Sequence, residues 1–395
     1  MISYDDALQR VIETVSSLEP VEIPLCEAAG LVLSSPAASR WDLPRNDNSA
    51  MDGFAIKASA EDLDKGLRII GASYAGHPFT GDVQEGQTVR ITTGAVLPSG
   101  ADTVVPIEEV EEKNGLVFPA AKSKSGQHVR YRGEEFYRGD VLIEPGGTIR
   151  AGEIALLASA GIERVIVFPR PRVAVISTGD ELLELGQEPG PGQIINSNLY
   201  FLENRLSECG CTPVCFGIGT DDPGTLDHLI EQALDADVII STGGVSVGDK
   251  DHVQATLNER DFTKVFWKVA IKPGKPILFG LLEGKPCFGL PGNPGSTAAT
   301  FELFVKPALK KLAGHPEILP EKREAILKNE VAGNTRRQIF LWSRLEWNGT
   351  GYEVTVPQRQ GSGQNRCLTA ANALLSVAAG IEKIDAGEKV EVFLL

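Results

Sequence analysis

The sequence predicts a multidomain protein of the α/β plus β class, with a central, doubly wound, mostly parallel α/β domain. Three observations favour this class. The chain has 395 residues, enough for about two to four domains. Apolar strand-like runs alternate with helical segments over residues 171–315, which is typical of βαβ units and a sheet covered on both faces. Short β-like runs between glycine and proline turns lie on both sides of this region.

The remaining segments predict smaller parts around the α/β domain. Residues 1–42 open with helical spacing, which returns in residues 136–170. We expect these segments to form one discontinuous N-terminal domain, helical or mixed, with the later segment packed on the first helix. Residues 43–135 lie between them and predict an inserted small β module with antiparallel strands. Residues 320–395 predict a small, barrel-like C-terminal β domain.

Charge and hydropathy exclude several classes of partner. The formal net charge is -15 and the pI about 4.9, so we expect no nucleic-acid partner, because an acidic surface repels a phosphate backbone. The first residues lack a basic stretch followed by an apolar one. No apolar run approaches the roughly 18 residues of a membrane span. We therefore expect no signal peptide, no membrane segment and a cytoplasmic location.

Cys209, Cys211 and Cys215 are close enough in sequence to raise the question of a metal site. Structural zinc usually takes a second pair of ligands and CxxC-type spacing, whereas this segment predicts the end of a helix followed by a strand. We therefore favour ordinary buried thiols. Reduced thiols suit a cytoplasmic protein.

Three polar, glycine-rich loops follow predicted strands of the α/β domain. Ligands of open α/β sheets bind beyond the carboxyl ends of the strands, where glycines let backbone N–H groups approach an anion. One such loop is weak evidence, but three at one edge favour a site for a phosphate-bearing ligand over three plain turns. The candidate binding residues are Ser177, Thr178, Gly179 and Asp180 in the first loop, Gly243, Gly244, Ser246 and Gly248 in the second, and Pro291, Gly292, Asn293 and Pro294 in the third.

Acidic residues accompany these loops, namely Asp180, Glu181, Asp221, Asp222, Asp249 and Asp251. Carboxylates beside a phosphate would repel it unless a cation lies between them, so this pattern predicts Mg²⁺ or a similar hard divalent ion. Simpler roles stay open for some of them. Asp222 fits a helix cap, and Asp180 and Glu181 fit the first turn of a helix, where the dipole favours acids.

Lysines cluster further along the α/β domain, at Lys268, Lys272 and Lys275, with two prolines nearby. Such a segment predicts a rigid cationic edge for an oxyanion or a phosphate. A solvated charged strand is the alternative, but the prolines and the neighbouring glycine loops favour a binding role. In the β module, Asp52-Gly53 by itself predicts only a hairpin turn.

Six short motifs stand out along the chain: residues 48–55 (NSAMDGFA), 92–95 (TTGA), 177–182 (STGDEL), 243–251 (GGVSVGDKD), 270–276 (AIKPGKP) and 289–294 (GLPGNP). With these motifs the chain resembles the molybdopterin molybdenumtransferases, the MoeA-type proteins related to the E domain of gephyrin. The resemblance extends over nearly the whole chain and is weakest after about residue 320. The series is highly specific, although no single motif would be.

The resemblance implies a function and an assembly. In this family, adenylylated molybdopterin and molybdate give molybdenum cofactor and AMP. The implied α/β domain is of the molybdopterin-binding type, and the implied homodimer places its active site between the β module of one subunit and the α/β domain of the other. A molybdopterin adenylyltransferase is then the upstream donor. The sequence leaves open that this chain is itself an adenylyltransferase, that it uses tungstate, or that it is a non-catalytic scaffold.

The resemblance also implies roles residue by residue. The implied catalytic residues are Asp52 and Thr93 of the β module, with Glu181, Asp221, Asp251, Lys268 and Lys272 of the α/β domain; Pro291 and Pro294 match the family's proline loop. The implied metal ligands are Asp221, Asp249 and Asp251. The implied molybdate contacts are Lys272, Lys275, Ser296, Arg337 and Ser362. One position departs from the family, whose Gly-Glu-Asp is Gly133-Glu134-Glu135 here, so the last carboxylate moves by one methylene.

Overall fold

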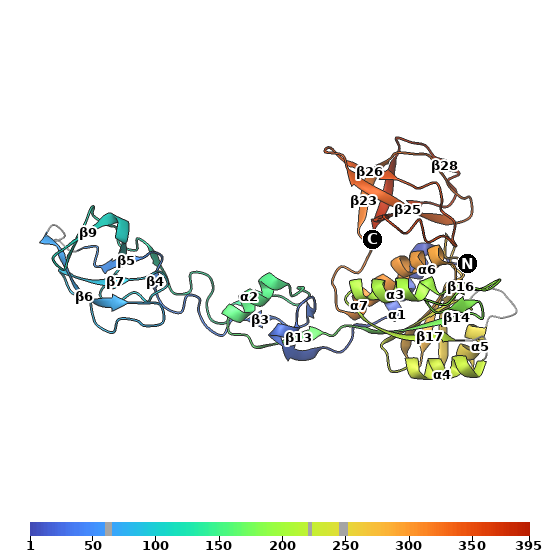
Figure 1. Cartoon of the computed structure of the whole chain (residues 1–395), viewed down its shortest axis with the longest axis horizontal. Coiled ribbons are helices and arrows are strands. Elements are labelled where there is room, and N and C mark those ends of the chain that lie inside the picture. Colours follow the sequence, from blue (N-terminus) through green and yellow to red (C-terminus); the bar gives the residue numbers. More distant parts are fainter. Residues whose placement is uncertain (60–64, 220–222, 245–251) are drawn as a thin grey trace.

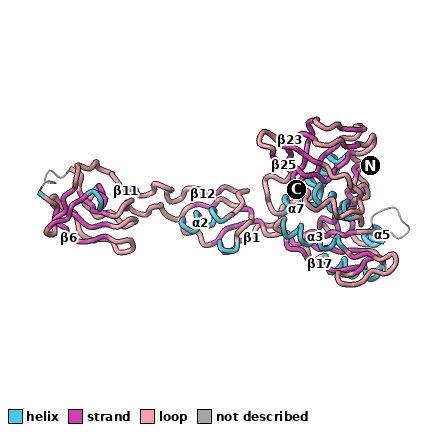
Figure 2. Tube along the Cα trace, turned by 45° about the horizontal axis from the view of Figure 1, so that its top comes forward, coloured by secondary structure: helices cyan, strands magenta, loops and turns pink. Residues whose placement is uncertain are grey.

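The molecule is long, with most of its mass at the two ends. The computed structural model describes residues 1–59, 65–219, 223–244 and 252–395. The β module lies at one end, the α/β domain and the C-terminal domain lie together at the other, and a narrow middle lobe joins them (Figure 1). A view turned by 45° shows the same separation (Figure 2). Both chain ends lie at the larger end, so the chain crosses the middle lobe twice.

The α/β domain is built on a mixed sheet with the strand order β17-β14-β18-β22-β21-β19. β14 runs parallel to β17 and to β18, and β18 runs parallel to β22, whereas β21 and β19 join antiparallel. The predicted doubly wound, mostly parallel sheet is confirmed. Its strands are β14 (Arg172–Thr178), β17 (Thr212–Gly219), β18 (Val238–Thr242), β19 (Phe262–Trp267), β21 (Leu278–Leu282) and β22 (Lys285–Leu290), with the short pair β15 (Leu182–Leu183) and β16 (Ile194–Ile195) beside them.

Side chains of the central strands alternate between two apolar cores, because successive residues of a strand point to opposite faces. Val173 and Val175 of β14 share one core with α1, α3, α6 and α7, and Ala174 and Ile176 share the other with α4 and α5. No helix of the described residues is long and apolar enough to cross a membrane. The helices are α1 (Tyr4–Thr14), α3 (Ser197–Glu208), α4 (Pro223–Ala233), α5 (His252–Asn258), α6 (Pro294–Thr300) and α7 (Lys306–Leu312), and the π-helical segment η4 (Phe301–Val305) links the last two.

The middle lobe has its own small core, in which Leu25, Leu33, Leu157 and Val167 pack together. The helix α2 therefore lies on the segment that follows α1, while α1 belongs to the core of the α/β domain. The expectation that residues 136–170 pack on the first helix is wrong, because an amphipathic pattern shows which face is buried but not what covers it. The lobe contains β1 (Val21–Pro24), η1 (Leu25–Glu27), β2 (Val32–Leu33), β3 (Ala37–Ala38), β12 (Val141–Ile143), α2 (Ala151–Ser159) and β13 (Arg164–Phe168).

The middle lobe meets the α/β domain where β13 ends against the turn after α7. The ring of Phe168 packs on Gly314, and a Cβ on that glycine would lie 2.0 Å from the ring. Gly314 has a φ of +72°, which glycine adopts without strain. The N–H of Leu18 adds a second link, donating to the carbonyl oxygen of Leu312 at 2.9 Å.

The β module is a mixed sheet with the strand order β8-β5-β7-β6-β10-β9. Neighbouring strands are antiparallel except β6 and β7, so the expectation of an antiparallel module is wrong for that pair. Its elements are β4 (Asn48–Ser49), β5 (Gly53–Ile56), β6 (Leu67–Ser73), β7 (Gln87–Ile91), β8 (Thr103–Pro106), η3 (Ile107–Glu109), β9 (Val110–Lys113), β10 (Leu116–Pro119) and β11 (Val129–Arg130).

The C-terminal domain is a closed barrel, as predicted. The strands β25, β26, β23, β29 and β27 pair in this order, and β27 pairs back with β25. The short strand β20 (Ile271–Lys272) of the α/β domain extends it by running parallel to β25. The elements of the domain are β23 (Lys322–Leu327), β24 (Val331–Ala332), β25 (Gln338–Trp347), β26 (Tyr352–Thr355), β27 (Ala373–Val377), β28 (Lys383–Ile384) and β29 (Lys389–Leu394).

The side chain of Tyr4, at the start of α1, joins the α/β domain to the barrel. The centroid of its ring lies 5.6 Å from that of Phe304 in η4, 5.1 Å from that of Phe340 in β25, and 6.0 Å from that of Phe393 in β29. Tyr4 is only 3% exposed. Its hydroxyl is buried without a hydrogen-bond partner among the described residues, and burial raises its pKa.

The clustered cysteines do not share one environment. Cys211 is buried, Cys209 is partly buried and Cys215 is exposed. Cys215 lies on β17, the edge strand of the sheet, so the prediction of a buried thiol is wrong at this position. Burial raises the pKa of Cys211 to about 12, which keeps this thiol protonated at neutral pH.

Substituting Tyr4→Ala removes the ring that fills the junction between the two domains. We expect the free energy of unfolding to fall by about 3–5 kcal/mol, because a buried aromatic side chain is replaced by a cavity. Tyr4→Phe is the matched control, since it keeps the ring and removes only the unpartnered hydroxyl. Urea denaturation followed by tryptophan emission measures both variants. A Tyr4→Ala protein that unfolds at the same urea concentration as the wild type would contradict the junction role.

Candidate active site

The carboxyl ends of the parallel neighbours β14, β18 and β22 meet at one edge of the sheet. Ser177 pairs with Thr242, so the first two glycine-rich loops begin side by side. A Cβ on Gly243 would lie 2.4 Å from the carbonyl oxygen of Thr178, and a Cβ on Gly292 would lie 3.6 Å from the Cα of Gly243. Gly243 also has a φ of +89°. The loops therefore pack backbone against backbone at this edge, which glycine allows because it has no side chain.

Hydroxyl groups hold the strands together beneath these loops. Thr242 Oγ1 donates to Ser177 Oγ at 3.3 Å, and Thr178 Oγ1 donates to the carbonyl oxygen of Thr242 at 3.2 Å. The side chain of Asn198 on α3 donates to the carbonyl oxygen of Gly292 at 2.7 Å. Ser177 and Thr178 thus fix the strand ends beneath the loops.

Asp180 and Glu181 are exposed and lead into the short strand β15. The alternative that they occupy the first turn of a helix is therefore wrong. The Glu181 carboxylate lies beside Gly179, where a Cβ would be 2.6 Å from Oε2. The Glu181 carbonyl oxygen accepts a hydrogen bond of 2.8 Å from the N–H of Ile194, which fixes the backbone at this point. A carboxylate thus stands beside the glycine loops.

Several expected ligands fall outside the described part of the chain. These are Ser246, Gly248, Asp249 and Asp251 of the second loop, with Asp221 and the cap candidate Asp222. Within residues 1–59, 65–219, 223–244 and 252–395, no group of three or more His, Cys, Asp or Glu side chains could hold a metal ion. The predicted Mg²⁺ site therefore stays a prediction.

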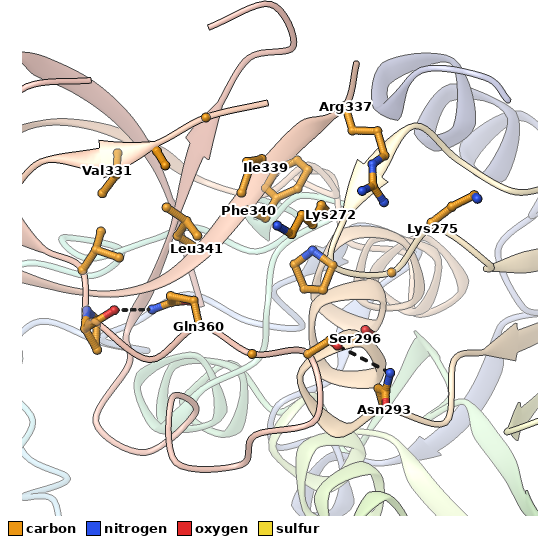
Figure 3. Close-up of a pocket in the computed structure, with 18 of the residues that line it drawn as sticks. Lys272, Lys275, Asn293, Ser296, Val331, Arg337, Ile339, Phe340, Leu341 and Gln360 are labelled. Atoms are coloured by element: carbon orange, nitrogen blue, oxygen red, sulfur yellow. Dashed lines mark hydrogen bonds between the residues drawn. The ribbon is translucent and has the colours of Figure 1, made fainter. Parts of the chain in front are cut away.

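A cavity of about 720 Å³ lies between the α/β domain and the barrel. Three of the cations at this cavity, Lys272, Lys275 and Arg337, lie toward one side of it (Figure 3). The two lysines are exposed and Arg337 is partly buried. The residues for which the family resemblance implies a molybdate contact all line this cavity: Lys272, Lys275, Ser296, Arg337 and Ser362. The arrangement suits an oxyanion, which charge-assisted hydrogen bonds hold best.

Backbone pairing brings these residues together from two domains. Because β20 runs parallel to β25, Lys272 lies beside the strand that begins directly after Arg337. Across the cavity, the N–H of Gly295 donates to the carbonyl oxygen of Ser362 at 2.8 Å, and Asn293 Nδ2 donates to Ser362 Oγ at 3.4 Å. A Cβ on Gly295 would lie only 3.0 Å from that carbonyl oxygen. The start of α6 is therefore docked on a loop of the barrel.

Lys268 does not share this cavity. Its Nζ lies 3.4 Å from the centroid of the Trp267 ring, a cation–π contact, and its backbone has a φ of +68°. The structure thus separates Lys268 from the lysines at 272 and 275, with which the sequence grouped it. Its implied catalytic role stays a prediction.

Asp52 and Thr93 form a pair in the β module, at the end of the molecule opposite the cavity (Figure 1). Asp52 Oδ1 accepts hydrogen bonds from the N–H of Thr93 at 2.6 Å and from its Oγ1 at 3.0 Å. The backbone bond first, and the hydroxyl bond second, hold the pKa of Asp52 below its usual value. Glu135 lines a separate cavity of about 530 Å³ with Asn48 and Arg130, where the chain enters and leaves the module. One protomer therefore does not bring these residues to the glycine loops.

Sequence reasoning missed two uncharged residues, Asn329 and Gln360, whose side chains fix the backbone around the main cavity. Gln360 Nε2 donates to the carbonyl oxygen of Trp342 at 2.8 Å, and its Oε1 accepts from the Trp342 N–H at 3.1 Å, as a neighbouring strand would. Asn329 bonds the backbone of Val356 in the same way, with both bonds at 3.0 Å. Such amide-to-backbone pairs have no fixed sequence spacing, so only the fold identifies them.

Comparison with known families covers most of the chain. Residues 2–161 match the MoeA N-terminal region (domain I and II), and residues 174–311 match the family described as a probable molybdopterin binding domain. Residues 324–395 match the MoeA C-terminal region (domain IV). The first match covers the β module and most of the middle lobe, the second covers most of the α/β domain, and the third covers most of the C-terminal barrel.

Curated relatives match over the full length. A molybdopterin molybdenumtransferase from Haemophilus influenzae is 37% identical over 99% of this chain and 98% of its own length. One from Nostoc sp. is 35% identical over 100% of this chain and 94% of its own length. The chain belongs to the molybdopterin molybdenumtransferase family.

Solved structures agree with this membership of the molybdopterin molybdenumtransferases. A molybdopterin biosynthesis MoeA protein from Pyrococcus horikoshii superimposes with a TM-score of 0.86 at 32% identity, covering 100% of this chain and 99% of that one. A second structure of a MoeA protein from that organism gives a TM-score of 0.80 at 28% identity, with full coverage of both chains.

Substituting Thr93→Val removes one of the two donors to Asp52 and keeps the other. We expect the pKa of Asp52 to rise but to stay below its usual value, because the larger effect comes from the backbone N–H. A folded-state pKa below the unfolded one stabilises the protein above the unfolded pKa, and that stability is lost as pH falls through the folded pKa. Thr93→Val should therefore be less stable than wild type at neutral pH and equally stable in acid.

Carboxyl ¹³C chemical shifts followed against pH measure the pKa of Asp52 directly. Thr92→Val, one residue away, is the control and should leave that pKa unchanged, since its hydroxyl lies 3.4 Å from the N–H of Ala75 instead. An unaltered Asp52 titration in Thr93→Val would show that the hydroxyl bond does not act on this carboxylate.

Proposed function

We propose that this protein inserts molybdate into adenylylated molybdopterin, releasing AMP and giving molybdenum cofactor. The observation that carries the proposal is the cavity in which Lys272, Lys275 and Arg337 from two domains line one side of a space for an oxyanion, with Asn293 of the third glycine-rich loop in the same lining (Figure 3). The names of the full-length relatives point to the same reaction. Neither an adenylyltransferase nor a non-catalytic scaffold has an observation in its favour.

Molybdate is a tetrahedral dianion, which explains the chemistry of the cavity. Lysine ammonium groups act as compact point charges, and the arginine guanidinium offers several N–H donors in a fixed plane. Ser296 and Ser362 also line the cavity, and their hydroxyls can add neutral donors. Tungstate has the same charge and shape, so these groups would hold either oxyanion.

The chain needs no nucleophile of its own for this reaction. Two oxygens of molybdate are replaced by the two dithiolene sulfurs and leave with the two thiol protons and two further protons as two waters, so molybdenum stays Mo(VI). The phosphoanhydride bond breaks when one water oxygen attacks phosphorus, which gives AMP and the second phosphate, returns the two further protons and leaves one water in the balance. The protein holds the oxyanion in the cationic cavity and the adenylate phosphates at the glycine loops. Positioning and fixed electrostatic groups are therefore the source of the rate increase.

We propose Mg²⁺ as the resident cation at the glycine loops. Asp180 and Glu181 already place carboxylates there, and hard oxygen donors are what this ion takes. Asp221, Asp249 and Asp251 would hold it, although they lie outside the described residues. When bound, the ion would neutralise phosphate charge that the carboxylates would otherwise repel.

We further propose a homodimer in which each site combines two chains. The support is the separation of the Asp52–Thr93 pair from the cavity along the length of one protomer (Figure 1). A second copy running in the opposite direction would bring its β module to this α/β domain. A molybdopterin adenylyltransferase would supply the substrate, and six free thiols suit a cytoplasmic location, which cell fractionation would check.

The direct test is AMP release from adenylylated molybdopterin when molybdate is added. We expect release by the wild type with Mg²⁺ and none after the ion is chelated. Arg337→Met should raise the KM for molybdate by about tenfold or more, because a charge-assisted contact is lost. Arg336→Met is the matched control, since that neighbour is exposed and does not line the cavity. Absence of AMP release by the wild type would refute the proposed reaction.

Mixed dimers test the shared site. Asp52→Ala and Lys272→Ala proteins should each be inactive alone. After subunits are mixed and exchanged, a heterodimer would hold one site with both defects and one site with none, so activity should return in part. If every site came from a single chain, mixing would restore nothing, and the two-chain site would be wrong.

A further inference from the structure

The cavity does not end at its cations. It continues from Lys272, Lys275 and Arg337 into the open end of the C-terminal barrel. We call this part the barrel mouth and define it by its apolar lining: Val331, Ile339, Leu341, Val356 and Pro357. Val331 and Leu341 lie on the side of the cavity away from Arg337 and Lys275 (Figure 3).

The size of the cavity calls for an organic ligand as well as an oxyanion. Sites for cofactor-sized molecules typically enclose about 300–1,000 Å³ and are largely apolar with a few polar groups. This cavity has about 720 Å³, of which a single tetrahedral oxyanion fills a small part. The barrel mouth therefore provides apolar side chains for the faces of a ring system, with the polar side chains of Glu330 and Gln358 nearby for its edge.

The barrel mouth is held open by its own hydrogen bonds. Asn329 ties the end of β23 to Val356 through two bonds of 3.0 Å, and Gln360 ties its loop to Trp342. Closure of the barrel by β25 and β27 leaves these walls little freedom to collapse. A preformed site of this kind binds a rigid ring at a low cost in conformational entropy.

We propose that the barrel mouth binds the pterin ring system of adenylylated molybdopterin, an inference that rests on the proposed function. Chemistry fixes the order of the parts, because the dithiolene sulfurs attached to the pterin must reach the molybdenum. The oxyanion lies at the cations, and the adenylate phosphates lie at the glycine loops. The third region that opens from the cationic end is the barrel mouth.

The glycine loops and the cavity adjoin at the third loop. Gly292 lies against Gly243 of the second glycine loop, and the next residue, Asn293, already lines the cavity. A ligand that extends from the glycine loops past Asn293 meets the cations and then the barrel mouth. Glu330 and Gln358 also line this end and offer oxygen acceptors to the amino and imino groups at a pterin edge.

The test is Leu341→Trp, which fills the barrel mouth with a larger ring. We expect the Kd for adenylylated molybdopterin to rise by about tenfold or more, because binding discriminates against a mismatched apolar volume by this factor. The Kd values for AMP and for tungstate should change by less than twofold. The control is Ile326→Trp, on the barrel strand β23, where the side chain is 38% exposed and outside the cavity. Titration calorimetry measures all three ligands.

The outcomes separate this inference from the proposed function. If wild type binds neither tungstate nor AMP, the proposed function fails and the inference fails with it. If wild type binds both, and Leu341→Trp still binds adenylylated molybdopterin as tightly, only the barrel-mouth site is overturned. An equal loss of all three ligands also overturns it. Val356→Phe replaces Leu341→Trp if that protein does not fold, with the same expected result.

Discussion

The contact of the Tyr4 ring with Phe304, Phe340 and Phe393 is the interaction on which the oxyanion cavity depends. The cavity has walls in two domains, and neither domain alone brings its cations together. η4 continues the helix that begins at α6, and β25 begins directly after Arg337. The Tyr4 ring therefore contacts one element of the α/β domain and one of the barrel that also form the walls of the cavity. Such a cavity keeps its shape only while the junction beneath it stays filled, because packed interiors relax little around a void.

A second constraint is electrostatic. The chain carries a net charge of -15, so its overall field repels the dianion that we propose it binds. The cations at the cavity overcome this at short range, where screening by salt is weak compared with direct contact. Deeper in the structure, the carboxylate of Glu302 is bonded by Arg205 at 2.6 Å and by Lys306 at 3.1 Å. That buried group ties α3 to the helix whose start carries Ser296, so charge pairing also supports the wall.

Sequence patterns predicted the parts whose geometry is local. Buried strands followed by glycines gave the loops at the carboxyl edge, because parallel strands must end on the same side. The same patterns could not place α1, because an amphipathic helix shows which face is buried but not which element covers it. They also could not separate Lys268 from Lys272, because Lys268 has a left-handed backbone and its side chain contacts the Trp267 ring. Sequence patterns also could not predict the hydrogen bonds of Asn329 and Gln360 at the barrel mouth, because their backbone partners are distant in sequence.

The anchor of Phe168 on Gly314 has a mechanical consequence. The middle lobe and the β module extend from this point as an arm, so a small rotation there becomes a large displacement of the β module at the far end of the molecule (Figure 1). Because Gly314 has no side chain, the Phe168 ring can pack directly on its backbone, and this contact sets the angle between the middle lobe and the α/β domain. Natural variation should be tolerated less readily at Gly314 than at exposed positions of the arm, because one added methyl group there would meet the Phe168 ring.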